Sequence, residues 1–343
     1  MKKSIFIFGC LLTLNFCTHA QTKSEYKIAN KFSLEGDGGW DYLTMDDSTG
    51  RLFVSHGTQV QVVDVKQGKM IGTISDLKGV HGIALAPEFN KGFITNGKDS
   101  SVTIFDLKTY TKLANVKVTG ANPDAILYDS FSKKVFIYNG KTSNATVIDA
   151  NTNKVVETIS LDGKPEFSVS DGKGKVYVNI EDKSAISMIN SSTLKVEKTW
   201  SIKPGEEPSG LAIDNVNHRL FAVCDNKLMV IIDAESGKVI TTLPIGERVD
   251  GAAFDPALKR AYSSNGDGTL TVVQEENANN FKVLENVSTQ KGARTISVDK
   301  KTHRVYLPTA EFGETPEKTK DNPHPRPSVK PNSFVVLDVQ VIK

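Results

Sequence analysis

The sequence predicts an all-β protein, a seven-bladed β-propeller with four-stranded blades, and three observations support this prediction. A short pattern of a basic residue, any residue and an aromatic residue recurs seven times in the 343-residue chain. The copies are 40 to 44 residues apart, and strand-like segments rich in valine and isoleucine flank each one. No long segment has convincing helical periodicity. Four short strands in each period of about 40 residues are typical of a propeller blade.

The recurring pattern is the second strand of each predicted blade, strand B, when strands A to D are counted outward from the axis. Its first residues are Arg51, Lys91, Lys134, Lys175, Arg219, Arg260 and Arg304. Strand A precedes it, as in residues 81–87 and 249–255. Strand C follows and usually ends in aspartate, as at Asp64, and strand D comes last, as in residues 154–159. Turns rich in glycine, asparagine and aspartate separate the strands.

The last blade is incomplete in sequence order. The seventh repeat supplies strands A, B and C before the sequence reaches Lys343, whereas a strand-like segment at residues 26–34 precedes the first blade. We expect this N-terminal strand to pair into blade 7 as its strand D, because that pairing closes the ring and removes two exposed sheet edges. Residues 21–343 are therefore predicted to form a single propeller.

The repeat resembles a known family. The period, the basic-x-aromatic strand B and strands such as Pro208-Ser-Gly-Leu-Ala-Ile-Asp resemble the YVTN-type β-propeller repeat family, of the YncE-like kind. The resemblance covers essentially all of the chain after residue 20. It implies a seven-bladed ring that serves as a binding scaffold, and it indicates architecture more strongly than activity, because propellers have many unrelated functions.

Residues 1–20 have the features of a cleaved export signal. A basic start is followed by an apolar run at residues 5–14 and by Ala20 at the expected cleavage site. The run is too short for a transmembrane helix, and no later segment is long and apolar enough. We therefore expect an exported protein, periplasmic or secreted. The alternative, a lipoprotein attached through Cys17, fits less well because the preceding Phe16 is bulky.

The charge of the chain argues against nucleic acid as a partner. Lys and Arg total 42, Asp and Glu total 40, and the excess of +2 lies in Lys2 and Lys3 of the expected signal. The remaining chain is neutral, whereas electrostatic binding to nucleic acid or a membrane surface needs a basic excess or patch. We expect a monomer that engages a small molecule or a protein at its loop-rich face. Cys224 is expected to be a buried thiol.

One position in strand A carries the candidate binding residues. It should face the mouth of the central channel, because strand A lines that channel and begins on the face that carries the D–A and B–C loops. Alignment of the seven A strands places these residues there: Asp41, His81, Asp124, Glu166, Ser209, Asp250 and Arg294. One interpretation is a water-filled channel lined by polar groups. The other is a ring that binds a ligand or a cation through its six ionisable members.

A divalent metal ion is the cofactor that this arrangement would accept. His56 ends strand B of blade 1 and should point to the same face as His81 of the next blade and Asp41. Two imidazoles and one carboxylate are suitable ligands for such an ion. In other blades the position of His56 is taken by asparagines that precede glycine and are expected to shape turns. These asparagines are Asn96, Asn139 and Asn265.

A proline-rich insertion at residues 308–333 interrupts blade 7 between strands B and C. Its six prolines and many charges exclude regular structure and favour extended backbone. Loops of this length are usually functional or disordered. As a B–C loop it should lie on the face of the ring, and we hypothesise that it forms a lid over the channel mouth. Its contact candidates are Glu311, Phe312, His324 and Arg326. The alternative is a flexible surface loop without a role.

Two functions from different classes stay open. The chain lacks a P-loop, a Gly-x-Ser-x-Gly elbow and a His-Glu-x-x-His motif, so no catalytic residue is assigned. The first hypothesis is an exported, non-enzymatic propeller that binds a ligand or partner at the channel mouth. The second is a metal-dependent lactone hydrolase, which resembles propeller lactonases such as gluconolactonase in shape. Its metal ligands would come from Asp41, Asp124, Glu166, Asp250 and Asn139.

Overall fold

The structure, a computed structural model, describes residues 25–36, 38–317, 319, 325 and 327–342. The expected export signal and two lid candidates, His324 and Arg326, lie outside the described residues. The described chain contains 28 strands and two short 3₁₀ helices, η1 (Pro87–Phe89) and η2 (Glu181–Lys183). No helix in this part of the chain is long and apolar enough to cross a membrane.

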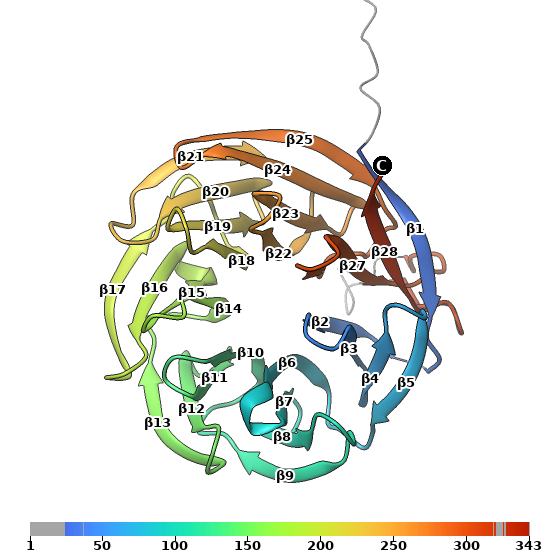
Figure 1. Ribbon diagram of the computed structural model, residues 1–343, viewed down its shortest axis with the longest axis horizontal. Coiled ribbons are helices and arrows are strands. Elements are labelled where there is room, and N and C mark those ends of the chain that lie inside the picture. The colour runs from blue at the N-terminus through green and yellow to red at the C-terminus, as the bar shows by residue number, and fades with distance from the viewer. Residues whose placement is uncertain (1–24, 37, 318, 320–324, 326, 343) are drawn as a thin grey trace, which may run out of the picture.

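The strands form seven antiparallel four-stranded sheets around a central axis, which confirms the predicted seven-bladed propeller (Figure 1). Blade 1 contains β2 (Trp40–Asp46), β3 (Arg51–His56), β4 (Gln59–Asp64) and β5 (Lys69–Ile74). Blade 2 contains β6 (Val80–Ala86), β7 (Lys91–Asn96), β8 (Ser101–Asp106) and β9 (Lys112–Lys117). Blade 3 contains β10 (Pro123–Asp129), β11 (Lys134–Asn139), β12 (Asn144–Asp149) and β13 (Lys154–Ser160).

The remaining blades follow the same plan. Blade 4 contains β14 (Pro165–Ser170), β15 (Lys175–Ile180), β16 (Ala185–Asn190) and β17 (Lys195–Ser201). Blade 5 contains β18 (Pro208–Asp214), β19 (Arg219–Cys224), β20 (Leu228–Asp233) and β21 (Val239–Pro244). Blade 6 contains β22 (Val249–Asp255), β23 (Arg260–Asn265), β24 (Thr269–Asn277) and β25 (Asn280–Ser288). Blade 7 contains β26 (Ser297–Asp299), β27 (Arg304–Thr309), β28 (Val335–Val341) and β1 (Tyr26–Ser33).

The recurring sequence pattern arises from packing between blades. Strands B and C are covered on both faces by neighbouring blades, whereas strands D, such as β17, are mostly exposed. Phe136 of blade 3, for example, shares a core cluster with Val176 and Val178 of blade 4. The aromatic residue of strand B is buried in all seven copies because it fills this space between sheets. These residues are Phe53, Phe93, Phe136, Tyr177, Phe221, Tyr262 and Tyr306.

The N-terminal strand closes the ring, as the sequence predicts. β1 pairs antiparallel with β28 from Tyr26 opposite Val341 to Ser33 opposite Val335, and so supplies the outermost strand of blade 7. The hydroxyl of Tyr26 lies 2.9 Å from the hydroxyl of Tyr262 in blade 6, and it accepts a hydrogen bond of 2.8 Å from Arg260 Nη1. The first described residues therefore tie blade 7 to blade 6.

The pairing of strands A and B is irregular near the channel mouth in six blades. In blade 1, Trp40 pairs with His56 and Leu43 with Val54, so two residues of β2, Asp41 and Tyr42, face one residue of β3. Similar register shifts occur in blades 2 to 6. Such bulges change the direction of side chains and are common next to binding sites. They fall at the aligned ring position in each of these blades.

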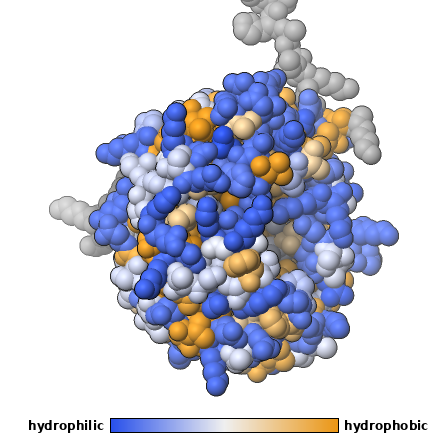
Figure 2. Space-filling view, turned by 60° about the vertical axis from the view of Figure 1, so that its left-hand side comes forward, coloured by the Kyte–Doolittle hydropathy of each residue, from blue (hydrophilic) through white to orange (hydrophobic). Residues whose placement is uncertain are grey.

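Polar side chains cover most of the surface in the view of Figure 2, and apolar ones lie in small separate groups. Large apolar residues that are exposed are distributed over several blades, as at Met70, Leu113, Phe131 and Val156. Scattered exposed apolar residues are normal for a globular protein. These exposed apolar residues therefore give no indication of a binding site.

Candidate functional site at the channel mouth

Five of the predicted ring residues form a continuous arc of alternating charge across five blades. The order is Asp250, Arg294, Asp41, His81 and Asp124, from blade 6 through blades 7, 1 and 2 to blade 3. Each basic member lies between two carboxylates. The alignment of the seven A strands predicted these residues at one equivalent position, and the structure shows which of them are neighbours.

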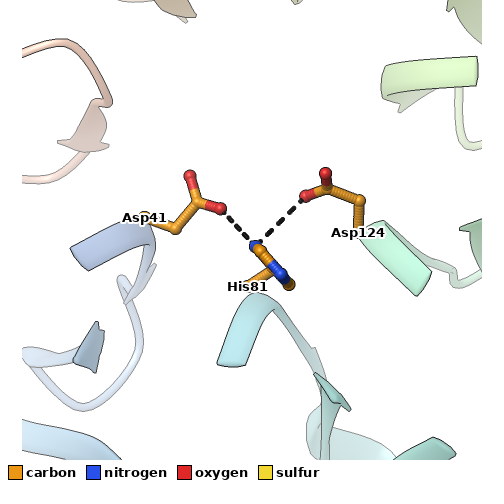
Figure 3. Close-up of side chains that lie close together, drawn as sticks. All are labelled: Asp41, His81 and Asp124. Carbon is orange, nitrogen blue, oxygen red and sulfur yellow. Dashed lines mark hydrogen bonds and ion pairs between the residues drawn. The ribbon is translucent and has the colours of Figure 1, made fainter. Parts of the chain in front are cut away.

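His81 lies between two aspartates from the adjacent blades (Figure 3). Its Nδ1 is 2.7 Å from Asp41 Oδ2, at hydrogen-bonding distance, and 3.7 Å from Asp124 Oδ1. A ligand atom from each of the three residues lies within 4.8 Å of the others. One nitrogen and two carboxylates therefore point at the same small volume.

The opposite edge of the His81 ring packs against backbone. A Cβ placed on Gly97 would lie 2.7 Å from His81 Nε2, which is closer than real Cβ atoms come to their neighbours. Asn122 Oδ1 lies near the same point, at 3.3 Å. Because Gly97 has no side chain, the imidazole can lie over this turn with Nδ1 directed at the carboxylates.

Arg294 continues the arc on the other side of Asp41. Its Nε donates a hydrogen bond of 2.7 Å to Asp250 Oδ2, and its Nη2 lies 3.8 Å from Asp41 Oδ1. Arg294 precedes β26, which has only three residues, so blade 7 presents this side chain from irregular backbone. The guanidinium thereby links blades 6, 7 and 1 at the mouth.

Hydrogen bonds between blades fix the backbone of the arc. Thr295 Oγ1 donates to the Asp41 carbonyl oxygen at 2.6 Å, and Thr95 Oγ1 donates to the Asp124 carbonyl oxygen at 2.7 Å. The backbone N–H of Asp41 donates to Ser55 Oγ at 3.2 Å. These hydrogen bonds hold the backbone of both aspartates, so the ring sets the positions from which the two carboxylates project.

Blade 4 contributes a separate acidic group. Glu166 lies 2.7 Å from Lys164 Nζ, which also pairs with Glu181 of η2. Lys164 and Glu181 were not predicted as site residues. Lys164 precedes Glu166 by two positions in the sequence, but the convergence of Glu181 from the B–C loop depends on the fold. Ser209 of blade 5 instead donates to the Val249 carbonyl oxygen, so it interrupts the ring of charges.

An aromatic pair narrows the channel beneath the ring. Tyr42 of blade 1 packs against Phe167 of blade 4, with ring centroids 5.4 Å apart, and belongs to a core cluster with Ala125 of blade 3. Burial raises the pKa of Tyr42 well above its usual value, and the charges of the four ring carboxylates add to this effect. We use the name acidic cup for the charged residues of the arc together with Lys164, Glu166 and Glu181. The sequence analysis missed the aromatic pair that packs across the channel beside them.

Burial and the charges of neighbouring groups raise the pKa values of Asp124, Asp250 and Glu166. Burial raises the pKa of Asp124 to about 6, and the charge of Asp41 adds to the rise. The pKa of Asp250 is also raised to about 6 by burial, although Arg294 opposes the change. Burial, a hydrogen bond to Glu181 and the charge of Asp124 raise the pKa of Glu166 to about 9.

The pKa of His81 is raised, which favours the protonated imidazole. Burial alone would lower it, but the hydrogen bond to Asp41 and the charges of Asp124 and Asp41 outweigh burial and raise it. Raised pKa values at these carboxyls and at the neighbouring imidazole indicate an excess of negative charge that the protein leaves partly uncompensated.

His56 does not join His81 and Asp41. It is almost fully buried, its Nδ1 lies 3.2 Å from Gln61 Oε1, and its ring packs on Phe334 at 4.1 Å between centroids. Asp124 takes its place in the group of three ligands. Asn139 is also buried, and it donates to Asn144 and Thr146 within its own blade. This matches the expectation that these asparagines shape turns.

The described part of the blade-7 insertion lies at the rim of the same face. Phe312 packs on Trp40, the residue before Asp41, with ring centroids 5.9 Å apart. A bridge between Phe312 and Val329 forms a short ribbon at the base of the insertion, and Lys330 pairs with Glu311 at 3.2 Å. Two of the four lid candidates are therefore placed at the rim. A lid movement stays a prediction.

Neither a protein-family model nor a curated protein matches the sequence. Many solved structures share its fold. Hydrazine synthase of Kuenenia stuttgartiensis is 17% identical at a TM-score of 0.70, and the match covers 80% of this chain and 94% of that chain. A structure of U3-55K is 8% identical at a TM-score of 0.75, covering 90% of this chain and 98% of that one. The WD40 repeats of RRP9 are 8% identical at a TM-score of 0.75, covering 91% and 98%.

At these identities the comparisons show the fold alone. They agree with the seven sheets described above. Function has to be argued from the residues at the mouth.

Proposed function

We propose that the protein is a binding module that recognises a positively charged group at the mouth of its central channel. The observation that carries this proposal is the alternating arc, which ends on two carboxyls, Asp124 and Asp250, whose pKa values are raised to about 6. Burial is the main cause of both raised pKa values and the charge of Asp41 adds to it, and a bound cation would stabilise the charged carboxylates against both effects.

The balance of charges at the cup supports a cationic ligand rather than an anionic one. Its acidic members are Asp41, Asp124, Glu166, Glu181 and Asp250, and its basic members are His81, Lys164 and Arg294. Each of these basic members is already paired with a carboxylate. An anionic ligand would also be repelled by Asp124, whose ion pair with His81 is long at 3.7 Å.

The experiment is a calorimetric titration of putrescine, a simple organic dication, into the untagged protein. The double variant Asp124→Asn/Asp250→Asn should weaken binding about tenfold or more. Asp162→Asn is the matched control, because it removes one charge from an exposed D–A loop on the same face, outside the arc. Equal affinity for wild type and the double variant would reject the cup as the binding site.

Family and location are part of the same proposal. We propose that the protein is an exported member of the YVTN-type propellers, which is supported by its repeat and by the signal-like residues 1–20. Mass spectrometry of the N-terminus in fractionated cells tests the second point. A start at Gln21 in a periplasmic or secreted fraction is expected, and an intact start at Met1 in the cytoplasm would contradict it.

A second candidate function, a metal-dependent lactone hydrolase, is supported by one specific arrangement. Asp41, His81 and Asp124 gather ligand atoms at one point, and Glu166, whose pKa burial raises to about 9, belongs to the same ring. A metal ion there would polarise a carbonyl group, and a protonated carboxyl can act as a general acid. Hydrolysis of gluconolactone above the blank rate, abolished by a chelator and by His81→Gln, is the test. An unchanged rate in His81→Gln would exclude this function.

A further inference from the structure

We propose that Asp41, His81 and Asp124 form a binding site for one divalent transition metal ion of the Zn²⁺ class. The inference deepens the proposed function and rests on it, because the metal would be a cation bound in the acidic cup. It assigns that cation to one end of the arc, away from Asp250. The ligands would be Asp41 Oδ2, His81 Nδ1 and Asp124 Oδ1.

The distances from His81 Nδ1 to the two carboxylate oxygens are close to those that this ion requires. Tetrahedral Zn²⁺ has bonds of about 2.0–2.2 Å to nitrogen and oxygen, so its ligand atoms lie about 3.3–3.6 Å apart. The separations from His81 Nδ1, 2.7 Å to Asp41 and 3.7 Å to Asp124, lie on either side of that range. Small side-chain rotations would therefore suffice. Three protein ligands leave a fourth position for water or for an external donor.

A comparison within the molecule separates this cluster from an ordinary ion pair. His303 makes a contact of the same length, 2.7 Å, with Asp255, and no third ligand group joins that pair among the described residues. At His81 a second carboxylate, from Asp124, faces the same nitrogen. One proton on Nδ1 can be donated to Asp41, but it leaves Asp124 at 3.7 Å, beyond hydrogen-bonding distance. A metal ion can bind both carboxylates.

Asp124 lacks any other compensating donor in the described structure. Its carboxylate accepts no hydrogen bond from the described residues, and its nearest basic group there is His81. Its side chain is only 24% exposed. A largely buried carboxylate without a donor is costly unless it is paired or coordinates a metal. Asp124 has only the long contact of 3.7 Å with His81 to compensate its charge, and a metal ion bound between the two aspartates would give it a closer partner.

The surroundings hold the ligands in place. The His81 ring lies over Gly97, which directs Nδ1 at the carboxylates, and the backbone of both aspartates is fixed by threonine hydroxyls from neighbouring blades. Groups that orient the ligands in this way commonly change metal affinity by about 10- to 100-fold when they are altered. Gly97 therefore offers a test that changes the geometry and leaves every ligand in the chain.

The experiment is a calorimetric titration of Zn²⁺ into untagged protein that has been treated with a chelator and dialysed. One ion per chain should bind, and His81→Gln and Asp124→Asn should each weaken binding about 10-fold or more. Gly97→Ala should also weaken it about 10-fold or more, because the added Cβ displaces the imidazole. Titration of Co²⁺ provides a second readout, since its visible absorption spectrum reports a change of ligands in each variant.

Two matched controls accompany these variants. Gly140→Ala adds the same Cβ at the equivalent turn of blade 3, where the nearest atom would be 3.7 Å away. His303→Gln removes the histidine of the other His–Asp pair. Both should bind Zn²⁺ like wild type. Circular dichroism and thermal unfolding show whether each variant is folded. If another variant does not fold, the result for Asp124→Asn decides the question.

The outcomes separate this inference from the proposed function. No Zn²⁺ binding up to about 1 mM, or equal affinity in wild type, His81→Gln and Asp124→Asn, would overturn the metal site. If putrescine still binds and depends on Asp124 and Asp250, the proposed function stands without the metal. If neither cation binds, both proposals fail. Loss of Zn²⁺ binding in His81→Gln, with putrescine binding kept, supports both.

Discussion

Replacing Tyr26 tests whether the N-terminal strand holds the ring closed. Tyr26 is 2% exposed, and its ring meets that of Tyr262 edge-on, with centroids 6.1 Å apart at an angle of 82°. Its hydroxyl contacts the Tyr262 hydroxyl at 2.9 Å and accepts a hydrogen bond from Arg260 at 2.8 Å. These contacts cross from blade 7 to blade 6, so they contribute to stability only if β1 is part of the ring.

The magnitude follows from the groups removed. Tyr26→Phe removes a hydrogen bond to a charged donor, which contributes about 1.5–3 kcal/mol. Arg260 keeps Glu25 at 2.6 Å and Gln274 at 3.2 Å, so we expect a loss near the middle of this range, about 2 kcal/mol. Tyr26→Ala also empties a buried site in the core and should cost about 3–5 kcal/mol.

Urea unfolding followed by far-ultraviolet circular dichroism measures both losses. Lys27→Ala is the control, because Lys27 is exposed on the same strand, and it should change the free energy of unfolding by less than about 0.5 kcal/mol. A cost for Tyr26→Ala as small as that of the control would refute the closure, because β1 would then not be part of the cooperative unit.

Three further predictions concern single residues. Burial, with Asp214 nearby, raises the pKa of Glu275 from 4.5 to about 7, so the folded protein retains a proton that the unfolded chain releases, and stability falls as the pH rises through this window. Glu275→Gln should therefore raise the free energy of unfolding by up to about 3 kcal/mol at pH 8 and leave it unchanged at pH 4. The control Glu276→Gln, at an exposed residue, should not raise it at either pH. An equal gain for Glu275→Gln at both pH values would contradict this prediction. Phe312→Ala should speed tryptic cleavage of the blade-7 insertion, because the contact with Trp40 is lost, and cleavage at the wild-type rate would show that this contact does not hold the insertion. Burial raises the pKa of Cys224 to about 12, so it should react with Ellman's reagent at pH 8 only after denaturation, and rapid reaction of the native protein would show that the thiol is accessible.

The architecture could be predicted because each blade repeats the same physical requirement. The aromatic residue of strand B fills the space between neighbouring sheets, and the turn residues recur with it, so seven copies reinforce one another. The closing strand followed from counting strands, since the last repeat lacked its fourth. The same alignment placed the ring residues at one equivalent position of strand A, and the structure brings Asp41, His81 and Asp124 together there.

The pairing within the site could not be predicted in the same way. Alignment treats the ring positions as equivalent, but the bulges, the short β26 and the inter-blade hydrogen bonds decide which side chains meet. His56 aligned near the mouth, yet its ring turns toward Gln61 and Phe334 within the blade-1 and blade-7 seam. Glu181 reaches the site from a loop whose path no periodic pattern encodes.

The most direct test of the cation site is an anomalous-diffraction measurement on crystals grown with equimolar Zn²⁺. The account predicts one strong zinc peak at the channel mouth, bonded to His81 Nδ1 and to the carboxylates of Asp41 and Asp124. Peaks confined to other surface groups, such as the His303–Asp255 pair, with none at the mouth, would contradict the assignment of the metal ion to this end of the acidic cup.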